Sequence, residues 1–219
     1  MAQPRRAQVD AARLRHVLWI GGGSGAGKST IANRLAAECG LRPYSSDDAM
    51  ADHVRRSNPS DHPLLHRFLA MSMDERWLDR SPAEMLRRFH GFRGEGFELI
   101  VEDLLALPAE PRILAEGFRL LPRLVAPLLS RSDQAAWLIP TPEFRRAVFA
   151  ARGSAHPIAR KTSRPEQALQ NLLSRDALFT TDLADEAAAL GLPLINVDVG
   201  HTIDDTKLRV AQVLNLATG

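Results

Sequence analysis

The sequence predicts an α/β fold built on a five-stranded parallel sheet that is sandwiched by helices. Short apolar runs of strand length alternate along the chain with stretches of helical periodicity, which is the pattern of parallel strands joined by helices. A glycine-rich stretch over residues 22–29 also joins the first apolar run to the first helical stretch. The length of 219 residues suits one domain that carries an insertion.

The elements follow in a regular order. The predicted strands cover residues 16–20, 41–45, 112–116, 135–139 and 194–199. Pro140 and Gly200 directly follow the fourth and fifth strands, where these residue types favour a turn. Helices are expected in the gaps, after Lys28, Arg119, Thr141, Pro165 and Thr202.

The gap between the second and third strands, at about residues 49–107, is too long for a simple crossover and has a helical pattern. Ser81, Pro82 and Glu84 form a helix start, with serine at the N-cap, proline at N1 and glutamate at N3. Apolar residues then repeat at helical spacing over residues 97–105. Such an insertion follows the carboxyl end of a strand, where ligands bind in open α/β sheets, so we expect a helical insertion that binds an acceptor.

The most specific motif fits the pattern G-x-x-x-x-G-K-[ST] in full. Its residues are Gly22, Gly23, Ser24, Gly25, Ala26, Gly27, Lys28 and Ser29. Glycines let the backbone fold around an anion and direct its amides, with a helix N-terminus, at phosphate. We expect Lys28 to reach the β- and γ-phosphates of a nucleoside triphosphate, Ser29 to ligate Mg²⁺, and Thr30 to belong to the same nucleotide-binding set.

Two other interpretations of this motif stay open. It could be a glycine-rich turn that binds nothing. It could also be a dinucleotide site, because Gly21, Gly23 and Ala26 loosely fit the Rossmann spacing and an acid follows at Asp47.

Acidic residues follow the second and third strands at the predicted ligand edge. Asp47, after the second strand, is expected to orient the acceptor and take its proton, or to contact the metal; capping of the next helix by Asp47 or Asp48 is the alternative. Glu116 ends the third strand as a Walker B acid does, and would hold the metal or receive the acceptor. Arg119 is expected to bind a phosphate or carboxylate of the acceptor, or else to be exposed on the following helix.

A basic segment, at about residues 145–164, follows the fourth strand and contains no acid. It holds Arg145, Arg146, Arg152, Arg160, Lys161 and Arg164. Such a segment can close over ATP as a lid and neutralise the charge that develops during transfer. We expect Arg152 to be catalytic and Arg160 to contact the nucleotide, with Lys161 as a further candidate.

Composition limits the other classes of function. The net charge of +2 argues against a protein that coats nucleic acid, although residues 1–15 are basic and predict a flexible tail. No apolar run is long enough to span a membrane. The one cysteine excludes an internal disulfide and suggests a reducing cytoplasm. The sequence gives no indication of the oligomeric state.

Taken together, the motif at residues 22–29, Asp47 and the Glu116-Gly117-Phe118-Arg119 run resemble the P-loop small-molecule and nucleotide kinases. This group includes shikimate, gluconate, adenylylsulfate, chloramphenicol and nucleoside monophosphate kinases, and the chain looks like a bacterial branch of it. The resemblance covers a core of about residues 16–210. For the single domain of residues 16–219 it implies the P-loop NTPase fold with strand order 2-3-1-4-5, and an arginine-bearing lid. It also implies that Asp47 contacts the acceptor hydroxyl and that Gly200 and His201 touch adenine. Monophosphate kinases have a proline before the arginine of this run, and this chain lacks it.

These observations lead to one expected function and several alternatives. The expected function is transfer of the γ-phosphoryl group of Mg-ATP to a small acceptor, at a hydroxyl, with ATP and Mg²⁺ as cofactors; the chain has no guanine-recognition motif. A nucleoside monophosphate kinase is the nearest alternative. A nucleotide-dependent switch or regulator, and a polynucleotide kinase, are the others.

Overall fold

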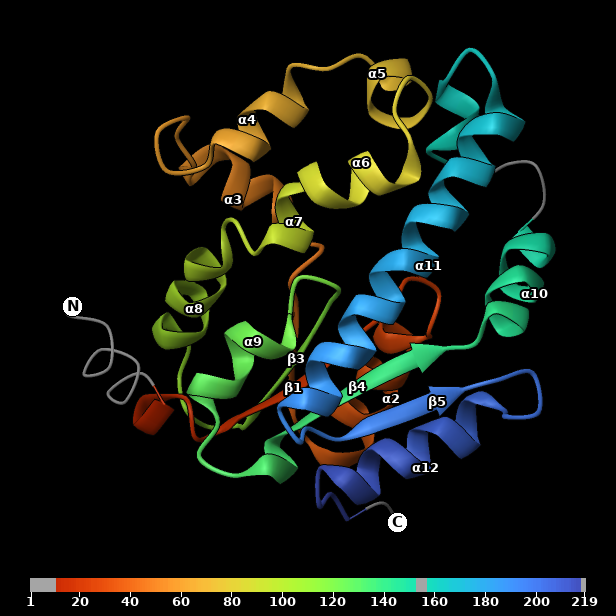
Figure 1. The fold of residues 1–219 in the computed structure, drawn as a ribbon. Coiled ribbons are helices and arrows are strands. Elements are labelled where there is room, and N and C mark those ends of the chain that lie inside the picture. The colour runs from red at the N-terminus through yellow and green to blue at the C-terminus, as the bar shows by residue number, and fades with distance from the viewer. Residues whose placement is uncertain (1–10, 153–156, 218–219) are drawn as a thin grey trace.

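One parallel sheet forms the centre of the structure. The computed structural model describes residues 11–152 and 157–217. The strands are β1 (Val17–Gly22), β2 (Arg42–Ser45), β3 (Ile113–Glu116), β4 (Ala135–Pro140) and β5 (Leu194–Val197). They pair in parallel in the order β2-β3-β1-β4-β5 (Figure 1). The chain therefore has the α/β P-loop NTPase fold, and the predicted strand order is confirmed.

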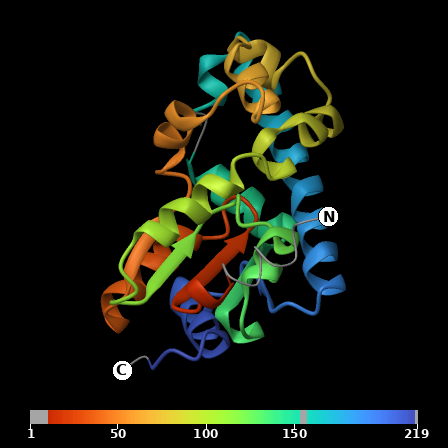
Figure 2. The ribbon, with the colours of Figure 1, turned by 90° about the vertical axis from the view of Figure 1, so that its left-hand side faces the viewer.

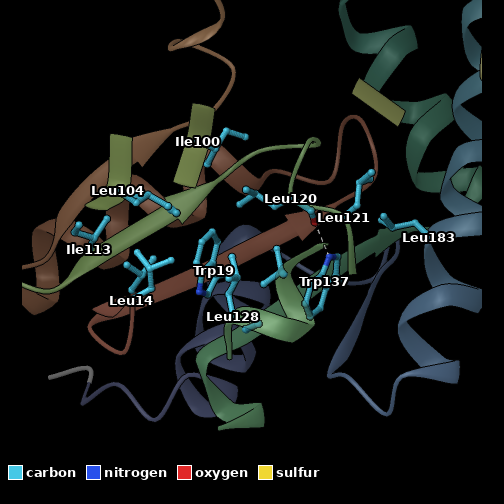
Figure 3. Close-up of a cluster of buried hydrophobic side chains, with 14 of the residues drawn as sticks. Leu14, Trp19, Ile100, Leu104, Ile113, Leu120, Leu121, Leu128, Trp137 and Leu183 are labelled. Atoms are coloured by element: carbon cyan, nitrogen blue, oxygen red, sulfur yellow. Dashed lines mark hydrogen bonds between the residues drawn. The ribbon is translucent and has the colours of Figure 1, made fainter. Parts of the chain in front are cut away.

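Helices cover both faces of this sheet. On one face, Trp19 and Trp137 point toward α8 (Phe97–Ala106), α9 (Pro122–Val125) and α11 (Pro165–Ala189), in a cluster that Figure 3 shows. On the other face, Leu18 and Ile20 pack with α2 (Lys28–Cys39) and α12 (Ile203–Val213). Successive side chains of a strand point to opposite faces, so an apolar run without alternation is what a strand buried on both faces requires.

The segment between β2 and β3 is helical, as predicted. Its helices are α3 (Met50–Arg56), α4 (Pro63–Leu69), α5 (Met73–Trp77), α6 (Pro82–Arg88), α7 (His90–Arg93) and α8. The predicted start of α6 is confirmed, because Ser81 Oγ accepts a hydrogen bond from the Glu84 amide at 3.2 Å. We call helices α3 to α7 the cap. They lie together beyond one end of the sheet, beside the N-terminal part of α11 (Figures 1 and 2).

The remaining short elements lie on either side of β4 in the chain. After β4 come α10 (Pro142–Arg152) and the short helix η4 (Ala159–Lys161), while η1 (Ala126–Leu128) and η2 (Ser132–Gln134) lie between α9 and β4. Of the helices in the described ranges, none is both long and apolar enough to cross a membrane.

The prediction of a flexible tail over residues 1–15 is wrong at its C-terminal end. Leu14 is fully buried in the core, and Gln134 Nε2 donates a hydrogen bond to the Arg15 carbonyl at 2.9 Å. Leu14 stands between the basic residues Arg13 and Arg15, so the local composition did not indicate a buried residue. Residues 1–10 lie outside the described part of the chain.

Candidate functional site

The strand register brings the ends of three strands to one edge of the sheet. Ser45 at the end of β2 is paired with Glu116, and Glu116 is paired with Ile20 of β1. The Ser46 amide donates to the Glu116 carbonyl at 2.9 Å. The acids predicted after β2 and β3 therefore lie beside the glycine-rich loop that leaves β1.

The glycine-rich loop needs its glycines. Gly25 and Gly27 have φ angles of 80° and 81°, which residues other than glycine rarely adopt. A Cβ on Gly23 would lie 2.7 Å from Thr180 Oγ1 of α11. The 12-residue helix α2 begins at Lys28, directly after the loop, so its free amides and its dipole favour an anion there. This geometry fits a phosphate chain.

Lys28 and Ser29 lie near the Glu116 carboxylate at the end of β3. Lys28 is buried, and its Nζ donates to the Gly23 carbonyl at 2.8 Å. Ser29 Oγ donates to Glu116 Oε2 at 3.1 Å. Hydroxyl and carboxylate oxygens are ligands that Mg²⁺ accepts beside phosphate, so this pair fits the predicted metal. Among the described residues, no group of three or more His, Cys, Asp or Glu side chains forms a separate metal site.

The charges of this group are partly removed from water. Burial lowers the pKa of Lys28, against the opposing effects of the Asp47, Glu116 and Asp176 carboxylates. Burial also raises the pKa of Glu116, and the negative charge of Asp47 raises it further. Desolvation strengthens the interactions between such groups and a charged ligand.

Asp47 is open to solvent beside this group. Desolvation by the surrounding protein raises the pKa of its carboxyl more than the Lys28 and Arg119 charges lower it. The alternative that Asp47 or Asp48 caps the next helix is wrong, because α3 begins at Met50 with Ala49 at the N-cap position. A carboxyl with a raised pKa at this place can accept a proton.

Arg119 is buried, and not exposed as the alternative interpretation supposed; only 3% of its surface is accessible. Its Nη2 donates to the Ser46 carbonyl at 2.8 Å and lies 2.5 Å from His53 Nδ1. His53 Nε2 in turn lies 2.7 Å from Asp103 Oδ2 of α8. The guanidinium therefore fixes the chain just before Asp47.

Helix α11 adds polar groups that the sequence analysis did not select. Arg145, which was assigned to the lid, is buried and donates to Thr180 of α11. Asp176, also buried, accepts hydrogen bonds from Nε and Nη2 of Arg175. The signal was present, because Asp176, Thr180 and Leu183 share one helical face with apolar neighbours, but their burial depends on the tertiary fold.

An aromatic pocket of about 390 Å³ opens between the loop and the cap. Ser24 of the loop lies at one side of it, and α11 contributes Arg175 and Asp176. Six aromatic rings line it: Phe68, Trp77, Phe89, Phe92, Phe118 and Phe179. These rings come from six separate elements or loops, so the sequence pattern alone did not reveal them.

The remaining predicted residues lie around the edge of the site. Gly200 and His201 are in the loop before α12, and a Cβ on Gly27 would lie 3.3 Å from Ile203 Cδ1 of that helix, so this loop is beside the glycine-rich loop. Arg160 and Lys161 are exposed in η4. Arg152 ends α10, and its side chain lies outside the described part of the structure.

Comparison with known proteins gives one partial match. No protein-family model matches the chain. A stretch of 76 residues is 40% identical to a probable adenylyl-sulfate kinase of Archaeoglobus fulgidus, over 34% of this chain and 44% of that protein. The match thus spans less than half the length of the relative. With the parallel sheet, this similarity agrees with a P-loop kinase-like fold.

Proposed function

We propose that the chain is an ATP-dependent kinase that transfers the γ-phosphoryl group of Mg-ATP to a hydroxyl of a small molecule. The observation that carries the proposal is the group formed by Lys28, Ser29, Asp47 and Glu116 at one edge of the sheet, with a pocket that opens between the glycine-rich loop and the cap. The partial similarity to a probable adenylyl-sulfate kinase supports the same class of reaction.

Each residue has a role that its position supports. The loop amides and Lys28 hold the phosphates, and Ser29 with Glu116 holds the metal. Asp47 accepts the proton of the acceptor hydroxyl, whose oxygen bonds to the γ-phosphorus while the bond to the β-phosphate oxygen breaks. The products are ADP and the phosphate ester. The raised pKa of Asp47 makes its carboxylate a stronger base than a fully solvated one.

The lid arginines belong to this proposal as well. Arg152 is assigned to charge neutralisation during transfer, and Arg160 to the nucleotide phosphates, with Gly200 and His201 at the adenine. Their positions after β4 and β5 support these assignments.

The first test is ADP formation from Mg-ATP, with and without pools of hydroxyl metabolites, nucleosides and nucleoside monophosphates. Lys28→Ala should abolish transfer, because it removes the side chain that contacts the phosphates. Lys207→Ala is the matched control, since Lys207 pairs with Glu38 near the C-terminal end of α2, away from Lys28 at its start. Slow hydrolysis that no pool stimulates would contradict the kinase and favour a nucleotide-dependent switch.

A nucleoside monophosphate kinase makes a different prediction. In that case Arg119→Ala should raise the KM of a phosphorylated acceptor sharply and that of a neutral one little. Arg119 is buried, and its Nη2 is already engaged with the Ser46 carbonyl and with His53. We therefore place this function second.

A further inference from the structure

The aromatic pocket has an unusual chemistry for a kinase of polar metabolites. Its rings contact one another in a continuous wall: Phe68 lies 5.4 Å from Trp77 and 5.2 Å from Phe89, and Phe92 stacks on Phe179 at 3.8 Å. The two ring pairs of Phe68 meet at steep interplanar angles of 74° and 85°, so the wall offers both ring faces and ring edges to a ring-shaped ligand. The volume of about 390 Å³ is near the lower end of the range for small-molecule sites.

The charges at the pocket balance one another. Arg175 lines the pocket, its Cζ lies 5.1 Å from the ring centroid of Trp77, and it is hydrogen-bonded to Asp176 through two nitrogens. His90 is neutral at pH 7, because burial lowers its pKa to about 4. An anionic acceptor buried here would meet no unpaired cation among the described lining residues, which makes its desolvation costly.

Three lining side chains carry a buried polar atom with no hydrogen-bond partner in the described part of the chain. These atoms are Trp77 Nε1, His90 Nδ1 and Arg175 Nη1. Buried polar groups are rarely left unsatisfied, and each exception needs an explanation. Small polar substituents on a bound ring, together with slight side-chain movement, would satisfy them.

We infer that the aromatic pocket is the acceptor site and that its acceptor is an uncharged, ring-bearing alcohol. This inference rests on the proposed kinase function and specifies its substrate class. The alcohol oxygen takes the γ-phosphoryl group, the β–γ bridging bond breaks to release ADP, and the hydroxyl proton passes to the Asp47 carboxylate. Ser24, at the side of the pocket nearest the loop, marks the end where that hydroxyl lies.

Trp77 provides a direct readout of pocket occupancy. The other tryptophans, Trp19 and Trp137, are fully buried in the sheet core, so a ligand-induced change in emission comes from Trp77. We expect 2-phenylethanol and cyclohexylmethanol to change the emission of the wild type and to leave that of Trp77→Phe unchanged. Glycerol and AMP should have no such effect.

The same four compounds serve as acceptors in a transfer assay with labelled Mg-ATP and Lys28→Ala as the blank. The ring alcohols should be phosphorylated with a KM at least tenfold below that of glycerol. Leu69→Arg, which places a charge at the pocket rim, should raise that KM about tenfold and leave the KM for ATP unchanged. Leu208→Arg on α12 is the matched control, because Leu69 and Leu208 are 39% and 48% exposed.

The outcomes separate this inference from the function on which it rests. Transfer to glycerol or AMP, with no binding or transfer for either ring alcohol, would overturn the acceptor class and leave the kinase intact. Binding of ring alcohols without any Lys28-dependent transfer would contradict the kinase and, with it, the assignment of the pocket to an acceptor.

Discussion

The sheet core and the cap use apolar side chains in opposite ways. In the sheet core, Val17, Leu18, Trp19 and Ile20 are all fully buried, and both faces of the sheet are filled by helices. In the cap, Phe68 and Phe89 are half-buried around a pocket of about 390 Å³, and Trp77 and Phe92 are buried beside them. Close packing stabilises a fold, whereas unfilled apolar surface offers a binding site. Under our proposal, the sheet core supplies stability and the cap supplies recognition of the acceptor.

The largest expected effect is on stability, from a truncation in the sheet core. Trp137 is fully buried, and its Nε1 donates to the Leu120 carbonyl at 2.9 Å (Figure 3). We expect Trp137→Ala to lower the free energy of unfolding by about 3–5 kcal/mol, measured by urea denaturation. Phe68→Ala in the cap should cost less than about 2 kcal/mol, since its ring already borders a cavity. Equal losses would contradict the division between the two regions.

The next largest effect is on turnover, from a substitution at the sheet edge that faces the cap. We expect Asp47→Asn to lower kcat by about 10²- to 10⁴-fold, because an amide cannot accept the hydroxyl proton. ATP affinity, measured by titration calorimetry, should stay close to that of the wild type. Asp48→Asn is the matched control, since it changes the same residue type one position along. Near-normal turnover of Asp47→Asn would remove this residue from the mechanism.

The third effect is a dependence of stability on pH that originates in the cap. His90 is buried, and desolvation, reinforced by the Arg119 charge, lowers its pKa to about 4. His90 therefore binds a proton more readily in the unfolded chain than in the folded one. Its contribution to the free energy of unfolding is fully present above about pH 6.5 and decreases as the pH falls toward 4. We expect a loss of about 3 kcal/mol over this interval.

The control for this effect is His90→Phe, which removes the proton-binding group and keeps a ring of similar size. Urea unfolding measured at several pH values should show a flatter profile for the variant than for the wild type. An unchanged profile would mean that other groups cause the acid sensitivity.

The smallest expected effect comes from removing the N-cap side chain of a helix, once in the sheet region and once in the cap. Thr202 Oγ1 accepts from the Asp205 amide at the start of α12, and Ser81 Oγ does so from the Glu84 amide at the start of α6. Each alanine substitution should cost about 1 kcal/mol. If the cap opens separately from the sheet, Ser81→Ala should speed hydrogen exchange in α5 to α7 alone, whereas Thr202→Ala should not. Identical exchange patterns would show that the regions unfold together.

The fold could be predicted because its signals are local. The glycine-rich loop and four apolar strands are visible as short patterns, and each strand boundary fell within a few residues of the structure. Strand β2 contains Arg42, Pro43 and Ser45, and its polar composition suits an edge strand that pairs with β3 alone. Helix caps such as Ser81 were equally readable, since a cap needs only neighbouring residues.

The pocket could not be predicted because it depends on distant segments meeting. Phe118 was noted only as part of a motif, yet its ring lies 5.9 Å from Phe89 and 5.8 Å from Phe92. Arg175 and Asp176 were not selected from the sequence, because their burial depends on the tertiary fold. The Arg175 guanidinium lies over the rings of Trp77, Phe89 and Phe92 of the cap. The roles of all the candidate site residues stay predictions, those of Arg152, Arg160, Gly200 and His201 among them.

Helix α11 connects the cap to the sheet core as one continuous helix. Its 25 residues extend about 38 Å at 1.5 Å per residue. Near its start, Ala168 and Leu172 pack with Trp77 of the cap, and near its end Leu183 is anchored in the sheet core. Between them, Thr180 lies against Gly23 of the phosphate loop. Because a helix is stiff along its axis, any tilt of the cap would be transmitted through α11 to its contact with the glycine-rich loop.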